Sequence, residues 1–261
     1  MENKKIPVGV ELYSVRKALS EDLEGTLEAL ASYGYEAVEF AGAPQYTPAR
    51  TAAALRASGL TVSSWHTPYD ALLTNDETFY KTAAHHLACG NRYMVIPWMP
   101  EDWMNSLESL KVTAEKLNKL SERLAEYGMF TGYHNHTAEF KPVGDTGKTT
   151  WTLLRELTCP QFLMQMDTGN CMAGDGDVNA ELLAGAGRSQ IVHLKPYSKT
   201  KGYATMIGDD DIDYKTIMNF CKKDGGTQIY VIEYEDAATY SELEGVRVCI
   251  ERLKTLYGDL L

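Results

Sequence analysis

Two histidines and a glutamate form the densest group of reactive side chains in the chain. The stretch GYHNHTAEF places His134, His136 and Glu139 within six positions, although the whole sequence contains only six histidines. Imidazole and carboxylate groups bind divalent cations and transfer protons near neutral pH. The stretch therefore indicates one wall of a polar site, used either for metal binding or for acid–base chemistry.

Three further ionisable residues close later apolar runs. Asp167 ends QFLMQMD, His193 lies near the end of SQIVHLK, and Glu233 lies near the end of QIYVIEYE. A carboxylate, an imidazole and a second carboxylate suit Mn²⁺, Mg²⁺ or Co²⁺, and suit Zn²⁺ less selectively. We expect one such ion, Mn²⁺ before the others, with a fourth ligand from residues 134–139, either Glu139 or one of the histidines.

Strands that end at a common rim would bring these residues together, and the sequence pattern supplies eight of them. Short apolar, β-branched runs alternate with amphipathic stretches at about 33 residues per unit, the size of a βαβ repeat. This pattern predicts the α/β class and a single (β/α)8 TIM barrel over residues 1–261, with its site at the carboxyl ends of the strands. An open doubly wound sheet is the alternative, but no G-x-G-x-x-G motif follows the first strand. The expected strands are residues 6–14, 35–42, 60–66, 91–98, 129–136, 161–167, 189–195 and 228–235.

An amphipathic helix is expected after each strand. Ser20 and Thr47 are the expected N-caps of the first two helices, and a proline follows Thr47 at the first helical position. The acidic tract GDDDID at 208–213 is interpreted as a solvated loop that caps the next helix. The expected helices are residues 20–34, 47–59, 76–90, about 102–127, 148–157, 178–187, about 213–223 and 241–258.

Five more residues near strand ends are candidates for contacts with a substrate or a reaction intermediate. Lys195 is a candidate to stabilise a developing oxyanion or to bind a hydroxyl group. His66 and Asn170 are assigned to substrate binding, with packing above the barrel as the alternative for His66. Tyr13 and Trp98 offer rings that stack on sugar faces, with ordinary barrel packing as the alternative.

Side-chain alternation along a strand gives the expected directions of several of these groups. His134 and His136 are two positions apart and are expected to face the same way. Glu39 closes the second strand and is interpreted as a tie between strands at the barrel rim. Glu235 is expected to point away from Glu233 and from the site.

Composition restricts the class of partner. The net charge of −11 argues against nucleic acid or an acidic membrane surface as a partner. Five scattered cysteines without a C-x-x-C pair are typical of reduced thiols, so we expect a cytoplasmic protein. No apolar run approaches the roughly 20 residues of a membrane span, and the first residues do not resemble a signal peptide.

Six motifs, in order along the chain, resemble the sugar phosphate isomerase/epimerase family of the xylose isomerase-like TIM barrels. The motifs are VELYSVR, GYEAVEFAG, YHNHTAEF, MDTGN, VHLKPYSK and VIEYED. In family members of the ketose 3-epimerase type, Glu, Asp, His and Glu from strands five to eight hold one divalent metal. The resemblance carries the last three of these ligands onto Asp167, His193 and Glu233. The fifth strand departs from the pattern with His134, and Glu139 is our first choice for the fourth ligand because it preserves the charge.

The resemblance implies a metal-dependent isomerase or epimerase that acts on a sugar, keto-sugar or cyclitol. A base removes a proton next to a carbonyl that the metal polarises. Glu233 is the first choice for this base, and Glu139, His134 or His136 would serve the opposite face, which epimerisation requires. The same pocket suits a dehydratase or lyase, and a non-catalytic sugar-binding barrel is a further alternative.

An AP endonuclease of the same superfamily needs three metals and a basic DNA-binding face, which the acidic composition argues against. Barrels of this kind often pair through their helices, so a homo-oligomer is a possible form.

Overall fold

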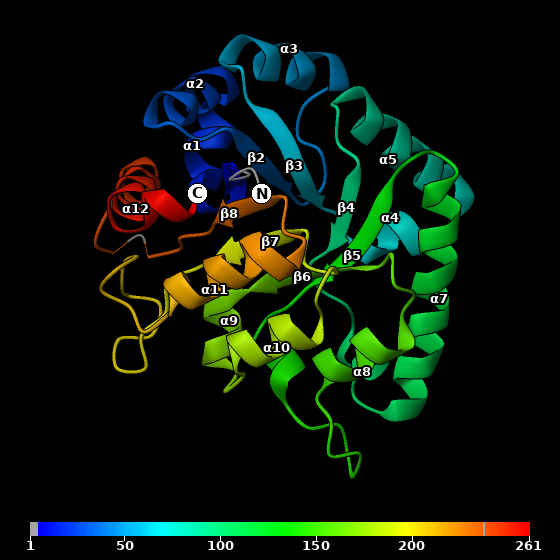
Figure 1. The fold of residues 1–261 in the computed structure, drawn as a ribbon. Helices are drawn as coiled ribbons and strands as arrows, with labels where there is room; N and C mark the ends of the chain where they lie inside the picture. The colour runs from blue at the N-terminus through cyan, green and yellow to red at the C-terminus, as the bar shows by residue number, and fades with distance from the viewer. Residues whose placement is uncertain (1–4, 237) are drawn as a thin grey trace.

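The chain folds into a closed barrel of eight parallel strands in the order β1 to β8, so the predicted fold class is confirmed. The computed structural model describes residues 5–236 and 238–261. Figure 1 shows the strands at the centre of the molecule with the helices around them. The strands are β1 (Val8–Glu11), β2 (Ala37–Ala41), β3 (Thr61–His66), β4 (Tyr93–Ile96), β5 (Phe130–His134), β6 (Leu163–Asp167), β7 (Ile191–Leu194) and β8 (Ile229–Ile232).

Helices connect successive strands and form the outer layer. Within the described ranges, none of them is both long and apolar enough to cross a membrane. The α-helices are α1 (Arg16–Glu21), α2 (Leu23–Tyr33), α3 (Pro48–Ser58), α4 (Tyr69–Leu73), α5 (Asp76–Ala88), α6 (Glu101–Met104), α7 (Leu107–Ala125), α8 (Thr150–Leu157), α9 (Thr168–Ala173), α10 (Val178–Ala184), α11 (Tyr214–Phe220) and α12 (Glu242–Tyr257). The short 3₁₀ or π turns are η1 (Leu12–Val15), η2 (Ala138–Phe140), η3 (Cys221–Gly225) and η4 (Gly258–Leu260).

Alternation along the strands separates two cores. One face of each strand packs against the helices in the large outer core, which contains Val10, Met166 and Leu194. The opposite face fills the barrel, where a smaller apolar cluster consists of Ala37, Val95, Leu163, Ile191, Ile229 and Val231. Two residues after these apolar positions the inward face becomes polar, because Gln165 follows Leu163 and His193 follows Ile191. The barrel therefore has an apolar floor and a polar mouth.

Several helix boundaries differ from the sequence prediction because of local capping. Asp22, not Ser20, caps α2, since its side chain accepts from the Gly25 N–H at 3.0 Å. The helix expected over 102–127 is divided into α6 and α7, because Ser106 adopts an extended conformation and begins a capping box. The prediction of Thr47 as the N-cap of α3 is confirmed.

β1 and β5 are among the strands that end earlier than expected, and their early ends change the direction of the residues that follow. β1 ends at Glu11 and the chain turns at once into η1, so Tyr13 lies in a turn and is exposed. β5 ends at His134, so strand alternation does not relate His134 to His136. His134 is buried in the barrel, whereas the side chain of His136 is exposed at its mouth.

Candidate metal centre and active site

Four buried side chains converge at the carboxyl ends of β5 to β8. One ligand atom from each of His134, Asp167, His193 and Glu233 lies within 4.8 Å of the others. His193 Nδ1 is 2.8 Å from Glu233 Oε2 and 4.0 Å from Asp167 Oδ2. His134 Nε2 is 4.0 Å from Glu233 Oε2. Two imidazoles and two carboxylates around a common point form a donor set suited to a divalent transition metal.

The two imidazoles are oriented by partners on their outer nitrogens. His134 Nδ1 lies 2.9 Å from Gln165 Oε1, so His134 Nε2 faces the centre. His193 Nε2 lies 2.8 Å from Glu39 Oε1, so His193 Nδ1 faces the centre. Metal-binding histidines are typically held in this way by a carboxylate or an amide oxygen on the other nitrogen.

Asp167 combines capping with a free oxygen. Its Oδ1 accepts from the Asn170 N–H at 2.6 Å and so begins α9. Its Oδ2 is buried and has no hydrogen-bond partner among the described residues. A buried carboxylate oxygen is costly to leave unsatisfied, and this one faces the other three ligand atoms, as a metal ligand would.

Glu139, our first choice for the fourth ligand, lies outside this group of ligand candidates. Its Oε1 accepts from the Tyr133 hydroxyl at 2.8 Å, and its Oε2 accepts from the His136 N–H at 2.7 Å. Tyr133 is on the outward face of β5, so it holds the carboxylate away from the inside of the barrel. His134, and not Glu139, is the residue of the 134–139 segment that lies with Asp167, His193 and Glu233.

The centre carries an excess of buried negative charge. Glu11, Glu39, Asp167 and Glu233 are all at most 5% exposed, and Lys195 is buried beside them. With these carboxylates ionised and the imidazoles neutral, four negative charges would face one ammonium group. Burying uncompensated charge is costly, so protons or a bound cation must supply the balance.

The pKa values of the imidazoles reflect this field. Burial lowers the pKa of His193, but the charges of Glu39 and Glu233 outweigh it and raise the value to about 10. Burial and the neighbouring His66 and His193 hold the pKa of His134 well below its ordinary value. The lowered pKa favours the neutral form of His134, the form in which an imidazole can bind a metal, and the raised pKa of His193 favours a positive charge, from a proton or a cation, at its Nδ1.

A second buried group, which sequence reasoning did not identify, lies beside the first. His66 Nδ1 is 3.0 Å from Glu11 Oε1, and His66 Nε2 is 2.9 Å from Glu39 Oε1. Gln165 joins the two groups, because its Oε1 lies 2.7 Å from His66 Nε2 and its Nε2 donates to Glu39 Oε2 at 2.6 Å. Glu39 thus does more than tie strands at the rim, since it contacts imidazoles on opposite sides of the barrel.

Lys195 bridges two carboxylates, those of the metal-ligand candidate Glu233 and of Glu235. Its Nζ donates to Glu233 Oε1 at 2.6 Å and to Glu235 Oε1 at 2.5 Å. The expectation that Glu235 points away from Glu233 was wrong, because both carboxylates accept from the same Lys195 ammonium group. Burial raises the pKa of Glu11 to about 7, and the charge of Glu233 adds to this increase.

A cavity of about 540 Å³ opens above these groups at the barrel mouth. Tyr13, His66 and His136, all assigned from the sequence to the site, contribute to its wall together with Glu11 and Glu233. The remaining lining residues are Leu12, Arg16, Leu19, Ala41, Gly42, Gln45, Pro97, His134 and Glu235.

Trp98 and Asn170, the other two substrate-binding candidates, lie elsewhere. Trp98 belongs to a neighbouring cavity. The Asn170 side chain is engaged within the protein, because its Oδ1 accepts from the Tyr203 hydroxyl at 2.7 Å and its Nδ2 donates to the Asn135 carbonyl at 3.2 Å.

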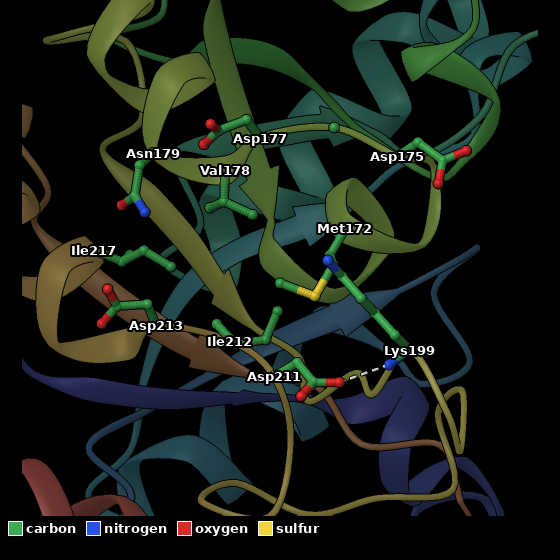
Figure 2. A pocket seen from close by; sticks show the side chains of 11 residues that line it. Met172, Asp175, Asp177, Val178, Asn179, Lys199, Asp211, Ile212, Asp213 and Ile217 are labelled. Carbon is green, nitrogen blue, oxygen red and sulfur yellow. Dashed lines mark hydrogen bonds between the residues drawn. The ribbon is translucent and has the colours of Figure 1, made fainter.

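An acidic cavity of about 360 Å³ lies away from this centre, between α10 and the loop before α11 (Figure 2). Its carboxylates have structural partners. Asp177 caps α10, Asp213 caps α11, and Asp211 accepts from the Lys199 N–H at 2.7 Å. The expectation that the GDDDID tract caps the following helix is thereby confirmed.

Sequence comparison defines the family to which this barrel belongs. The model of the xylose isomerase-like TIM barrel family matches residues 27–256, and the chain belongs to that family. The search of curated proteins found no match.

Solved structures share the fold along nearly the whole chain. A sugar phosphate isomerase/epimerase from Parabacteroides distasonis ATCC 8503 superposes with a TM-score of 0.85 at 23% identity, covering 98% of this chain and 96% of the other. An L-ribulose 3-epimerase gives 0.72 at 14% identity, with 96% and 94% covered. The IolI protein with a bound zinc atom gives 0.72 at 11% identity, with 98% and 99% covered. At these identities the similarity is one of fold.

Proposed function

We propose that this protein is a divalent-metal-dependent sugar isomerase or epimerase. The observation that carries the proposal is the convergence of His134 Nε2, Asp167 Oδ2, His193 Nδ1 and Glu233 Oε2 at the mouth of a barrel with a cavity above them. Structural neighbours that include an L-ribulose 3-epimerase and a zinc-bound protein support the same chemistry.

The residues fit one divalent cation. Asp167 Oδ2 is a buried oxygen without a hydrogen-bond partner in the described part of the chain. The outer nitrogen of His134 is hydrogen-bonded to Gln165 Oε1, whereas that of His193 lies 2.8 Å from Glu39 Oε1 without a hydrogen bond between them. Two nitrogen and two oxygen donors suit Mn²⁺, Co²⁺ or Zn²⁺ better than Mg²⁺, and Mn²⁺ remains our expectation. When bound, the ion would polarise a sugar carbonyl and acidify the adjacent C–H bond.

Proton transfer is assigned to groups around the cavity. Glu233 is the proposed base, and Lys195, bonded to it at 2.6 Å, would stabilise negative charge on the substrate. His136, two residues after β5, and Glu11 on β1 approach the cavity from opposite sides of the eight-stranded barrel. Because β1 is paired with β8, Glu11 lies on the same side as the base Glu233, and His136 is the group suited to exchange a proton on the opposite face of a sugar, as epimerisation requires.

Removal of a proton next to the sugar carbonyl leaves a carbanion. If this carbanion expelled a leaving group instead of being reprotonated, the protein would be a dehydratase or lyase. Isomerisation, epimerisation and elimination therefore share the removal of that proton as their first step. A panel of ketohexoses and inososes incubated in D₂O tests this common step, with NMR detecting deuterium at the carbon next to the carbonyl. We expect exchange by the metal-loaded protein and its loss in Glu233→Gln. Asp211→Asn, which changes an acidic residue of the cavity in Figure 2, is the matched control and should exchange normally.

Metal content separates the enzyme from a non-catalytic barrel. Elemental analysis should find about one divalent ion per chain, lost in Asp167→Asn and in Glu233→Gln and retained in Asp211→Asn. A native protein that binds no Mn²⁺, Co²⁺ or Zn²⁺ even when these are supplied would overturn the proposal and leave a sugar-binding barrel without catalysis.

A further inference from the structure

A second cavity, of about 690 Å³, adjoins the cavity at the barrel mouth. It lies between the segment that follows β4 and the segment that follows β5. The side chain of His136 lines both cavities and so marks their junction. The other lining residues are Trp98, Met99, Glu101, Met104, Asn105, Ala138, Glu139, Lys141, Pro142, Val143 and Thr150.

The second cavity has an apolar floor and a polar rim. Met99, Met104 and Val143 are buried beneath it. The exposed side chains of Glu101 and Asn105 stand at its edge. Binding sites for small molecules commonly combine an apolar surface with a few polar groups that fix orientation, in a volume of about 300–1,000 Å³.

Trp98 provides the aromatic surface of the cavity. It is 57% exposed, although the other large aromatic side chains beside it, Tyr69 and Trp103, are partly buried. The ring of Tyr69 lies 5.7 Å from that of Trp98 and 5.4 Å from that of Trp103, and this packing supports the indole from one side. An indole that leaves much of its surface open beside a polar pocket is suited to the apolar face of a ring whose edge carries hydroxyl groups.

The junction between the cavities is held rigidly. Glu139 Oε2 accepts from the His136 N–H at 2.7 Å, and Glu139 Oε1 accepts from the Tyr133 hydroxyl at 2.8 Å. Glu139 therefore fixes the backbone from which the His136 imidazole projects. The buried Glu139 carboxylate thus has a structural role, positioning His136, that does not depend on metal binding.

We propose that the second cavity is a binding subsite for a second sugar ring, so that the substrate is a glycoside of at least two rings. One ring lies at the metal centre, the glycosidic bond passes His136, and the second ring stacks on Trp98. A monosaccharide would fill only the cavity at the barrel mouth. This inference rests on the proposed function for the placement of the first ring, but binding in the second cavity requires neither metal nor turnover.

Fluorescence quenching tests the subsite directly. Of the four tryptophans, Trp65 and Trp151 are buried and Trp103 is partly buried, so acrylamide should quench Trp98 most strongly. Cellobiose, maltose and lactose are the disaccharide probes, and D-glucose is the single-ring probe. We expect at least one disaccharide to protect the signal that Trp98→Phe removes, and D-glucose to leave it quenchable.

Affinity measurements on variants provide the second part of the test. Trp98→Ala should weaken binding of the protecting disaccharide at least tenfold and leave D-glucose binding unchanged. Trp103→Phe is the matched control, because Trp103 also packs on Tyr69 but does not line the cavity. The proposal is overturned if no disaccharide protects Trp98, or if Trp98→Ala weakens binding of both sugars equally.

The same titrations on protein supplied with Mn²⁺ and on EDTA-treated protein, each with its metal content measured, separate the two proposals. Protection of Trp98 in both forms, with no metal bound in either, would support the subsite and sink the metal-dependent function. One metal ion per chain together with deuterium exchange, but no protection of Trp98 by any disaccharide, would support the metal-dependent function and overturn the subsite.

Discussion

The choice between His134 and Glu139 as the fourth metal ligand leads to opposite outcomes in two single variants. His134→Asn keeps an amide nitrogen close to the position of Nδ1, where it can still donate to Gln165 Oε1, and deletes Nε2, the atom that faces the centre. Loss of an outer partner of a metal ligand typically costs 10–100-fold in affinity, so loss of a direct ligand should cost more than about 100-fold.

This loss has a thermal consequence that can be calculated. At a metal concentration of 100 times the wild-type Kd, binding stabilises the folded wild type by about 2.7 kcal/mol. A 100-fold weaker Kd reduces this stabilisation to about 0.4 kcal/mol. At roughly 2–4 °C per kcal/mol for a protein of this size, adding metal should raise Tm by about 5–10 °C in the wild type and by about 1 °C in His134→Asn.

Glu139→Gln should behave in the opposite way. It converts two bonds to a charged acceptor, from the Tyr133 hydroxyl and the His136 N–H, into neutral ones. A bond to a charged group contributes about 1 kcal/mol more than a neutral one, so the variant should lose about 2 kcal/mol of stability without metal. Its metal affinity should stay close to that of the wild type.

Isothermal titration of EDTA-treated protein with Co²⁺, together with melting curves with and without the ion, measures both quantities. The reasoning is refuted if Glu139→Gln loses metal binding while His134→Asn retains it. That result would return Glu139 to the ligand position suggested by charge alone.

Three further predictions concern the scaffold around the site. Gly132→Ala should lose more than about 3 kcal/mol of stability in urea unfolding, because the added Cβ would lie 2.3 Å from the Leu163 carbonyl oxygen on the adjacent strand. Asp22→Ala should lower the free energy of unfolding by about 1 kcal/mol through loss of the α2 cap, whereas Ser20→Ala should change it little. Equal shifts of Tm in thermal melts of the two variants would contradict the assignment of Asp22 as the cap. Burial raises the pKa of Asp210 from 3.8 to about 6, so its folded form binds a proton that its unfolded form has released. The stability that Asp210 contributes is complete below pH 4 and is lost as pH rises to 6. Asp210→Asn should therefore gain stability relative to wild type over that interval. Parallel plots of unfolding free energy against pH for the two proteins would contradict the raised pKa of Asp210.

The barrel and three of the converging ligand candidates were predictable because both depend on local periodicity. Eight apolar runs with helices between them indicate the strand order of a barrel, and the last residues of neighbouring strands must meet at its mouth. Asp167, His193 and Glu233 come from β6, β7 and β8, which are consecutive in sequence and adjacent in space. Their juxtaposition needed no information about contacts across the barrel.

The position of Glu139 was not predictable in the same way, because it depends on where β5 ends. Strand alternation predicted that His136 faces the same way as His134, but the strand stops at His134. The chain then turns into η2 and brings Glu139 to the outward-facing Tyr133. An argument from charge favoured the carboxylate, whereas the end of one strand decided its direction.

Glu11 and Glu39 were undervalued for a different reason, and the sequence did contain a signal for them. Strands of a parallel barrel are buried on both faces, so a carboxylate inside VGVE or AVEFA cannot reach water and must find a buried partner. Register pairs Glu11 with Glu39 on neighbouring strands, and a third side chain, His66 of β3, lies between their oxygens. The sequence cannot show that Glu39 also reaches His193 on β7, because that contact exists only when the barrel is closed. A charged residue within a strand of this fold should therefore be treated as part of the site until a different partner is found.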